Sequence, residues 1–163
     1  MQHLRRLLLL PALAGALLLG ACAKEPPPPG VIDLAIKAGT DINPGPDGTP
    51  APALVRVYQL ASPVKFQNAD FFLLFEKEAD TLGADLLGRE EISVSPGETK
   101  TLNQPLKPSA NHVGVAAAFR DIDKATWRAV VEVPPHGTTK LESEVRKLEI
   151  DLKTVERDSK EKK

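Results

Sequence analysis

The sequence predicts an all-β fold, an antiparallel β-sandwich that carries a small helical insertion. Short segments rich in β-branched residues recur along the chain, several alternate apolar and polar residues with a period of two, and turns with proline or glycine separate them. One stretch, residues 68–77, instead places its apolar residues at helical spacings. The 163 residues suffice for one domain with a core, and a net charge of -1 offers no footprint for nucleic acid.

The N-terminal segment has the parts of a lipoprotein signal peptide. Arg5 and Arg6 form a positive region, residues 7–19 are almost wholly apolar, and small residues precede Cys22, the only cysteine. We therefore expect residues 1–21 to be cleaved and Cys22 to carry covalent lipid, with no other cofactor. An ordinary secretory signal is the alternative. A transmembrane helix is disfavoured because the apolar run is shorter than the ~20 residues that a bilayer requires.

The mature chain is predicted to start with a lipidated, proline-rich stalk, residues 22–30. Several acyl chains would anchor it stably, since each buried methylene contributes about 0.8 kcal/mol. Ala23 stands where an inner-membrane lipoprotein commonly has aspartate, which favours the periplasmic face of the outer membrane. The run of prolines at 26–29 favours a stiff polyproline II segment, with a disordered leader as the alternative. The domain is then predicted over residues 31–152, followed by a charged, flexible tail over residues 153–163.

The domain is predicted to consist mostly of strands. Ile32, Leu34 and Ile36 alternate with polar or small residues, as in a half-buried strand. Residues 113–119 are almost continuously apolar, which is typical of a central strand covered on both faces, and their glycine and alanines indicate close packing by a bulky group. The other predicted strands are residues 54–60, 91–94, 99–106, 127–133 and 141–152, the last as one long strand or two short ones.

The helical insertion is predicted from two adjacent segments. Residues 68–77 begin with a capping sequence, and a second short turn is predicted over residues 80–87. Both are expected to pack on one end of the sandwich, with their aromatic rings in the core and not around a cofactor. The inward-facing residues would be Phe71, Leu74, Phe75, Leu82, Leu86 and Leu87.

The connection between the first two predicted strands is the candidate functional segment. Residues 39–53 are far longer than a hairpin needs, and their prolines and glycines restrict the chain without making it regular. Such loops often serve in recognition, although a passive connection is the alternative. Asp41, Asn43 and Asp47 match a calcium loop only loosely, because prolines interrupt them and the terminal glutamate is missing.

The residues that an enzyme would need do not converge in the sequence. His3 falls in the signal peptide, His112 follows an asparagine in a predicted turn, and His136 lies between prolines and a glycine. No serine lies in a nucleophile-elbow motif, and no spacing of ligands suits zinc. The sequence therefore predicts a binding protein and not an enzyme.

Ordered sequence blocks between residues 41 and 133 resemble the TssJ (VasD, Lip) outer-membrane lipoproteins of type VI secretion systems. Each block alone is weak evidence, but their order after a lipobox is specific. The segment after Pro134 departs from the family pattern. The blocks are residues 41–44, 48–52, 55–60, 69–72, 82–87, 96–97, 113–121 and 127–128, with Phe66 between them.

The resemblance implies a transthyretin-like β-sandwich and an adaptor function. Members of this family anchor a trans-envelope complex and bind the periplasmic C-terminal domain of the inner-membrane protein TssM, which sits with TssL. The implied contact is the loop between the first two strands, here residues 41–52. The alternative is a transthyretin-like periplasmic lipoprotein that holds a small ligand or cell-wall component in a cleft lined by Phe71, Phe75 and Trp127. The residues expected to bind the partner are Asp41, Ile42, Asn43, Pro44, Asp47 and Gly48.

Overall fold

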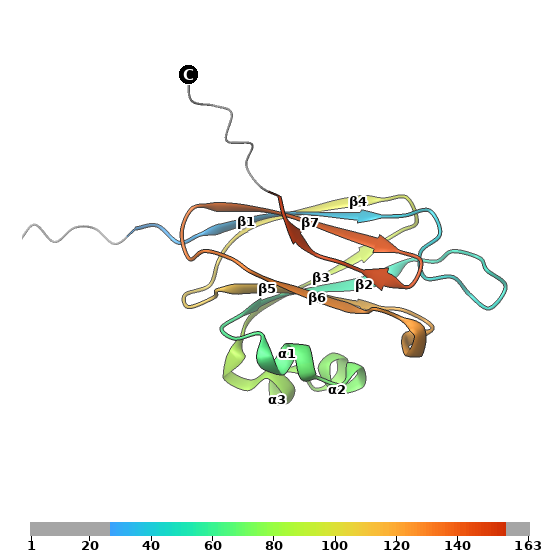
Figure 1. The fold of residues 1–163 in the computed structure, drawn as a ribbon, viewed down its shortest axis with the longest axis horizontal. Helices are drawn as coiled ribbons and strands as arrows, with labels where there is room; N and C mark the ends of the chain where they lie inside the picture. Colours follow the sequence, from blue (N-terminus) through green and yellow to red (C-terminus); the bar gives the residue numbers. More distant parts are fainter. Residues whose placement is uncertain (1–26, 156–163) are drawn as a thin grey trace, which may run out of the picture.

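The computed structural model describes residues 27–155, which form two stacked β-sheets with a layer of short helices against one of them (Figure 1). Cys22 and the predicted signal peptide lie outside the described residues. One sheet has the order β4-β1-β7-β8, with β9 also paired to β7, and the other has the order β3-β2-β5-β6. The strands are β1 (Val31–Ala38), β2 (Ala53–Leu60), β3 (Leu86–Val94), β4 (Thr99–Pro105), β5 (His112–Ala118), β6 (Arg128–Glu132), β7 (Thr138–Arg146), β8 (Glu149–Ile150) and β9 (Lys153–Thr154).

The predicted sandwich is confirmed, and its strand pairs are antiparallel with one exception. β1 and β7 pair in parallel, from Val31 opposite Thr138 to Ala38 opposite Val145. The two strands start together because the Gly30 N–H donates to the carbonyl of Pro135 (2.7 Å) and the Val31 N–H to that of Gly137 (2.8 Å). Gly30, the last residue of the predicted stalk, is therefore built into the domain.

The main core lies between the two sheets. Ile32, Leu34 and Ile36 of β1 are fully buried, which confirms the period-two pattern, and they share the core with Val55 and Val57 of β2. Among residues 27–155, every buried residue of this core falls within positions 32–152, the range predicted for the domain.

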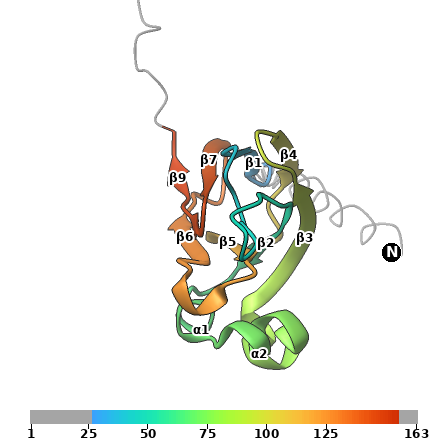
Figure 2. The same cartoon turned by 90° about the vertical axis from the view of Figure 1, so that its right-hand side faces the viewer.

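A second, smaller core lies between the outer face of the β3-β2-β5-β6 sheet and the helices, so the domain has three layers (Figure 2). The predicted close packing on the fifth strand is confirmed at Gly114, where an added Cβ would stand 2.9 Å from two ring atoms of Phe66. The helices of this layer are α1 (Val64–Asn68), α2 (Phe71–Glu76), α3 (Glu78–Leu82) and the 3-10 turn η1 (Gly83–Asp85).

The predicted helical insertion is present, with different boundaries. The carboxylate of Asp70 caps α2 by accepting from the N–H groups of Phe72 (2.9 Å) and Leu73 (3.1 Å), as the capping sequence predicts. The prediction of a helical turn over residues 80–87 is wrong at its end, because Gly83 (φ 56°) terminates α3 and Leu86 already begins β3. None of the helices among residues 27–155 is long and apolar enough to cross a membrane.

The C-terminal part of the domain is more regular than predicted. The segment 141–152 is divided between β7 and β8, and the tail predicted to start at Lys153 begins instead with strand β9. Lys153 holds this strand on β7 through an ion pair with Glu142 (Nζ to Oε1, 2.9 Å). The predicted tail beyond residue 155 lies outside the described residues.

Candidate protein-interaction site

The β1–β2 loop projects from one end of the sandwich, and the chain enters β1 from the opposite end (Figure 1). The β3–β4 turn lies at the same end and bonds to the start of the loop, since the Gly97 N–H donates to the Gly39 carbonyl (2.9 Å). Two further connections flank the loop on the side where it opens a pocket, the β5–β6 connection with its 3-10 turn η2 (Ile122–Lys124) and the β7–β8 turn. The N–H of Thr126 donates to the carbonyl of Leu148 (2.9 Å), which joins these two neighbours. We call the β1–β2 loop, the β5–β6 connection and the β7–β8 turn together the loop end.

Two residues at the start of the loop fasten it to the domain. Ile42 is fully buried in the main core, and Asn43 is 4% exposed. The side chain of Asn43 accepts from the N–H of Arg120 (2.7 Å) and donates to the carbonyl of Pro52 (2.7 Å). Its own N–H donates to the carbonyl of Lys147 (2.7 Å). Asn43 thus ties the loop to both of its neighbours and to its own far end.

Asparagine is suited to this position for a conformational reason as well. Asn43 has φ 48°, in the left-handed region that asparagine tolerates better than most residues other than glycine. A carboxamide also supplies both an acceptor and a donor, which the Arg120 N–H and the Pro52 carbonyl require.

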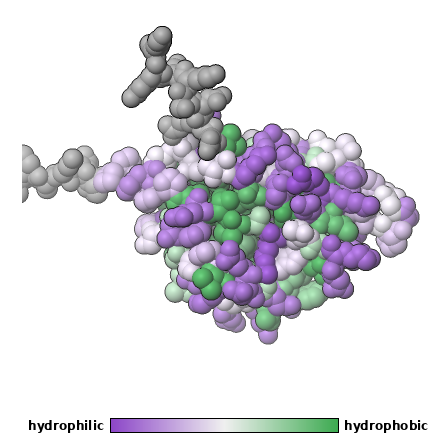
Figure 3. All heavy atoms as spheres, viewed as in Figure 1, coloured by the Kyte–Doolittle hydropathy of each residue, from purple (hydrophilic) through white to green (hydrophobic). Residues whose placement is uncertain are grey.

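The tip of the loop is a hydrogen-bonded turn. The Gly45 N–H donates to the Thr49 carbonyl (2.9 Å), and Gly48, with φ 79°, closes the turn onto the Gly45 carbonyl (2.9 Å). The carboxylate of Asp47 accepts from the hydroxyl (2.7 Å) and N–H (3.0 Å) of Thr49, and these bonds lower the pKa of Asp47. The exposed tip therefore keeps its own shape. In the space-filling view the projecting loop is mostly pale and purple (Figure 3).

The structure divides the six residues predicted to bind a partner into two groups. Asp41, Asp47 and Gly48 are exposed and Pro44 is half-buried, so all four offer surface to another protein. Ile42 and Asn43 are buried and hold the base of the loop on the domain. The side chains of Asn43 and Asp47, which the calcium reading would require as ligands, make hydrogen bonds within the protein instead.

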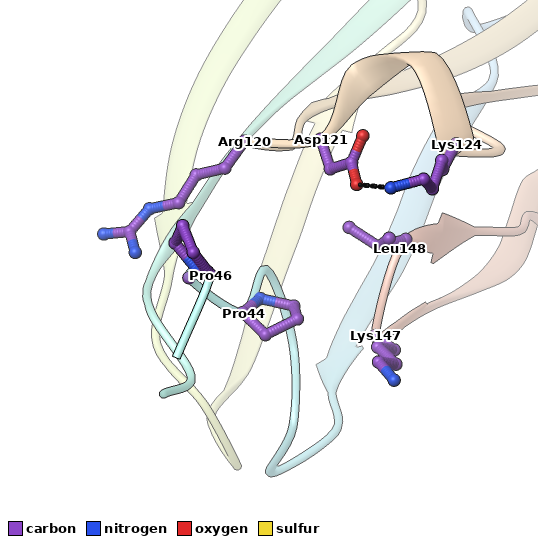
Figure 4. A pocket seen from close by; sticks show the side chains of 8 residues that line it. Pro44, Pro46, Arg120, Asp121, Lys124, Lys147 and Leu148 are labelled. Atoms are coloured by element: carbon purple, nitrogen blue, oxygen red, sulfur yellow. Dashed lines mark hydrogen bonds and ion pairs between the residues drawn. The ribbon is translucent and has the colours of Figure 1, made fainter. Parts of the chain in front are cut away.

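A pocket of about 610 Å³ opens beside the loop, between the three connections (Figure 4). Pro44 and Pro46 line it from the β1–β2 loop, and Leu148 points into it from the β7–β8 turn. The polar side chains around it come from the same turn and from the β5–β6 connection, and they are Arg120, Asp121, Lys124 and Lys147. Asp121 and Lys124 pair with each other (2.8 Å).

Three residues that line the pocket, Arg120, Lys147 and Leu148, are not among the residues predicted for the site. Arg120 lies in one of the sequence blocks that resemble the family, which indicates that the position matters. Only the fold, however, places it beside the β1–β2 loop. No pattern marks Lys147 and Leu148, which follow Asn43 by more than a hundred positions.

The cleft that the alternative function requires is filled by its own side chains. The Phe71 ring packs on Phe75 with centroids 4.4 Å apart and meets Trp127 edge-on at 5.2 Å. The guanidinium of Arg128 covers the indole of Trp127, 4.3 Å from the ring centroid. All three aromatic residues are half-buried, and Phe75 and Trp127 pack against the smaller core, so the predicted core role holds only in part.

A family model described as type VI secretion lipoprotein, VasD, EvfM, TssJ matches residues 31–151. The chain belongs to this family. The match confirms the resemblance drawn from the sequence blocks, and with it the function in type VI secretion and the localisation as an envelope lipoprotein. Members of the family are structural lipoprotein components of the secretion system. The matched residues include all three connections of the loop end.

Solved structures agree in fold over most of the domain and confirm the transthyretin-like sandwich. The T6SS lipoprotein TssJ1 from Pseudomonas aeruginosa is 32% identical with a TM-score of 0.76, covering 80% of this chain and 99% of that chain. Lip, a membrane-bound component of the type VI system of Serratia marcescens, is 26% identical with a TM-score of 0.69, covering 77% and 97%. A chain in a structure described as the TssM C-terminal domain from EAEC is 30% identical with a TM-score of 0.63, covering 78% and 98%. No curated protein sequence matches the chain.

Proposed function

We propose that this lipoprotein is an outer-membrane adaptor that binds the periplasmic C-terminal domain of a TssM-like inner-membrane protein, within a trans-envelope complex that includes TssL. The main contact is the exposed tip of the β1–β2 loop, residues 44–50. Similarity to a chain in a TssM C-terminal domain structure supports the choice of partner.

The observation that carries the proposal is the rigid attachment of this loop. Ile42 and Asn43 fix its base, and the hydrogen bonds of Asp47 and Gly48 fix its tip. A loop that already has its bound shape loses little conformational entropy on docking, so more of the contact energy remains as affinity.

The position of the loop also suits an adaptor. The chain enters the sandwich at one end, and the loop projects from the other (Figure 1). A domain anchored through its N-terminus can therefore present the loop away from the membrane that carries it.

The anchor itself is proposed to be covalent lipid on Cys22, with no other cofactor. An adaptor needs no chemistry, and we propose that the domain is not an enzyme. Cys22→Ser in the full-length chain should leave the domain folded and release it from the outer-membrane fraction into the soluble periplasm. Persistence of the serine variant in that fraction would refute the lipid anchor.

The test of partner binding should alter the tip and leave its base intact. In residues 23–163, we would replace Pro44, Pro46, Asp47 and Pro50 with serine and keep Ile42 and Asn43. Titration against the purified TssM C-terminal domain should show saturable binding for the natural sequence and at least a tenfold loss for the tip variant. A folded tip variant with unchanged affinity would refute the loop as the contact.

A matched control lies at the other end of the sandwich. Pro134, Pro135 and His136 form an exposed connection before β7. Replacing these three residues with serine alters a proline-rich loop of similar character without touching the loop end, and should leave affinity unchanged. Equal losses in both variants would point to general destabilisation.

A further inference from the structure

We propose that the pocket at the loop end receives an apolar side chain of the partner that is flanked by acidic residues, with Arg120 and Lys147 as the cations that select it. This inference rests on the proposed adaptor function and specifies the chemistry of the partner surface. It adds two connections, β5–β6 and β7–β8, to the contact made by the β1–β2 loop.

The apolar part of the pocket calls for an apolar occupant. Pro44 and Pro46 stand on one side and Leu148 points toward them from the β7–β8 turn (Figure 4). The rings of the prolines are rigid, and Leu148 is only partly covered by the main core. A volume of about 610 Å³ exceeds a single side chain, so the pocket can take one together with its neighbours.

The polar part of the pocket is cationic, in contrast to the chain as a whole. Arg120, Lys124 and Lys147 line it with a single carboxylate, Asp121, whereas the whole chain has a net charge of -1. Lys124 is neutralised by Asp121. Among the described residues, no ion pair within 4.0 Å engages the guanidinium of Arg120 or the ammonium of Lys147. The Arg120 charge also helps to lower the pKa of Asp47 at the loop tip, without forming an ion pair with it, so both cations can still attract carboxylates of a partner and Lys147 is the less compensated of the two.

The two cations are held on opposite sides of the pocket by the same residue. The backbone N–H of Arg120 and the backbone carbonyl of Lys147 both bond to Asn43, each at 2.7 Å. Their backbone separation is thereby fixed, and the two side chains extend away from each other, Arg120 beside Pro46 of the loop and Lys147 on the far side of Leu148 (Figure 4). The arrangement favours a partner with carboxylates on both sides of an apolar residue.

The experiment measures binding of residues 23–163 to the TssM C-terminal domain for Arg120→Glu, Lys147→Glu and the control Lys140→Glu. Lys140 is an exposed lysine of β7, at the end of that strand far from the pocket. We expect about a tenfold or greater increase in Kd for each pocket variant and less than twofold for the control. Raising NaCl from about 50 to about 300 mM should weaken partner binding by the natural chain more than binding by Lys147→Glu. Salt screens the attraction between Lys147 and partner carboxylates, which the variant lacks.

Each outcome separates this inference from the adaptor function. If the tip variant loses binding while Arg120→Glu and Lys147→Glu retain it, the adaptor function stands, and the proposed binding of an acidic partner segment in the pocket is refuted. If the natural chain does not bind the TssM C-terminal domain at all, both the adaptor function and the proposed pocket contact are refuted. Recovery of Arg120→Glu binding when one partner carboxylate is reversed to lysine would establish the pair directly. Urea midpoints of Arg120→Glu and Lys147→Glu should match that of the natural chain, since the bonds of Arg120 and Lys147 to Asn43 use backbone atoms of these two residues only.

Discussion

Replacing Asn43 with alanine tests how the β1–β2 loop is held. The Arg120 N–H and the Pro52 carbonyl each lose a partner. Each loss costs about 1 kcal/mol, at the low end for buried polar groups because both residues border solvent and water can replace part of the bond. Alanine at φ 48° adds about 1 kcal/mol. We therefore expect the free energy of unfolding to fall by about 3 kcal/mol.

Urea unfolding of residues 23–163 measures this change through the midpoint at constant slope. Asn43→Gly provides a comparison, since glycine accepts the positive φ and loses only the hydrogen bonds, so it should be less destabilised than the alanine variant. Asn103→Ala, on the exposed side of β4, is a matched control that should change stability by less than about 0.5 kcal/mol.

The reasoning would be refuted by an Asn43→Ala variant within about 0.5 kcal/mol of the natural chain. It would also be refuted if glycine were the more destabilising replacement, because the left-handed conformation would then carry no cost for alanine. The same variant should weaken partner binding, since the loop loses its side-chain bonds to the β5–β6 connection and to its own far end, while the backbone bond to Lys147 remains.

Three further predictions concern packing and titration. Gly114→Ala places a methyl group 2.9 Å from the ring above it, and should lower the free energy of unfolding by about 1–3 kcal/mol; an unchanged urea midpoint would contradict this. Burial raises the pKa of Tyr58, the only tyrosine, to about 12, so phenolate absorbance should stay low at pH 11, and a midpoint near 10 would show an exposed phenol. The stability that this shift represents is complete below pH 10 and is lost as pH rises towards 12. Hydrogen bonds from Lys37 and then Lys153 lower the pKa of Glu142 to about 2, so its stabilisation is present above pH 4.5 and lost as pH falls towards 2. The midpoint difference between the natural chain and Glu142→Gln should shrink over that range, and a constant difference would argue against the ion pairs.

Local patterns were enough to predict the sandwich and much of its core. The alternation at Ile32, Leu34 and Ile36 identifies one buried face, because side chains on a strand point alternately to its two sides. Asp70 predicts the start of α2, because a helix cap is a local contact between a side chain and the N–H groups two and three positions later. A short apolar run fits either period, so the pattern predicts a helix at Leu86 and Leu87, which lie in β3.

The loop end shows what a pattern cannot supply. Length and composition identify the β1–β2 loop, but two of the three hydrogen-bond partners of Asn43 lie far along the chain, 77 positions away at Arg120 and still further at Lys147. Those contacts exist only after the two sheets have stacked. The chemistry of Ile42 and Asn43 therefore predicts contact residues, whereas both side chains are buried and hold the base of the loop.

The path of β1 through the domain has a mechanical consequence. β1 enters at the anchored end and leaves directly into the loop, and it pairs with β4 on one side and β7 on the other along its length. Tension between the membrane and a partner held at the loop would pull along this strand. Because ladder hydrogen bonds run across the strand, such a pull loads them together in shear and does not open them one at a time. The strand that would bear the load is thus clamped on both sides, and we expect the domain to transmit force between the two membranes before it unfolds.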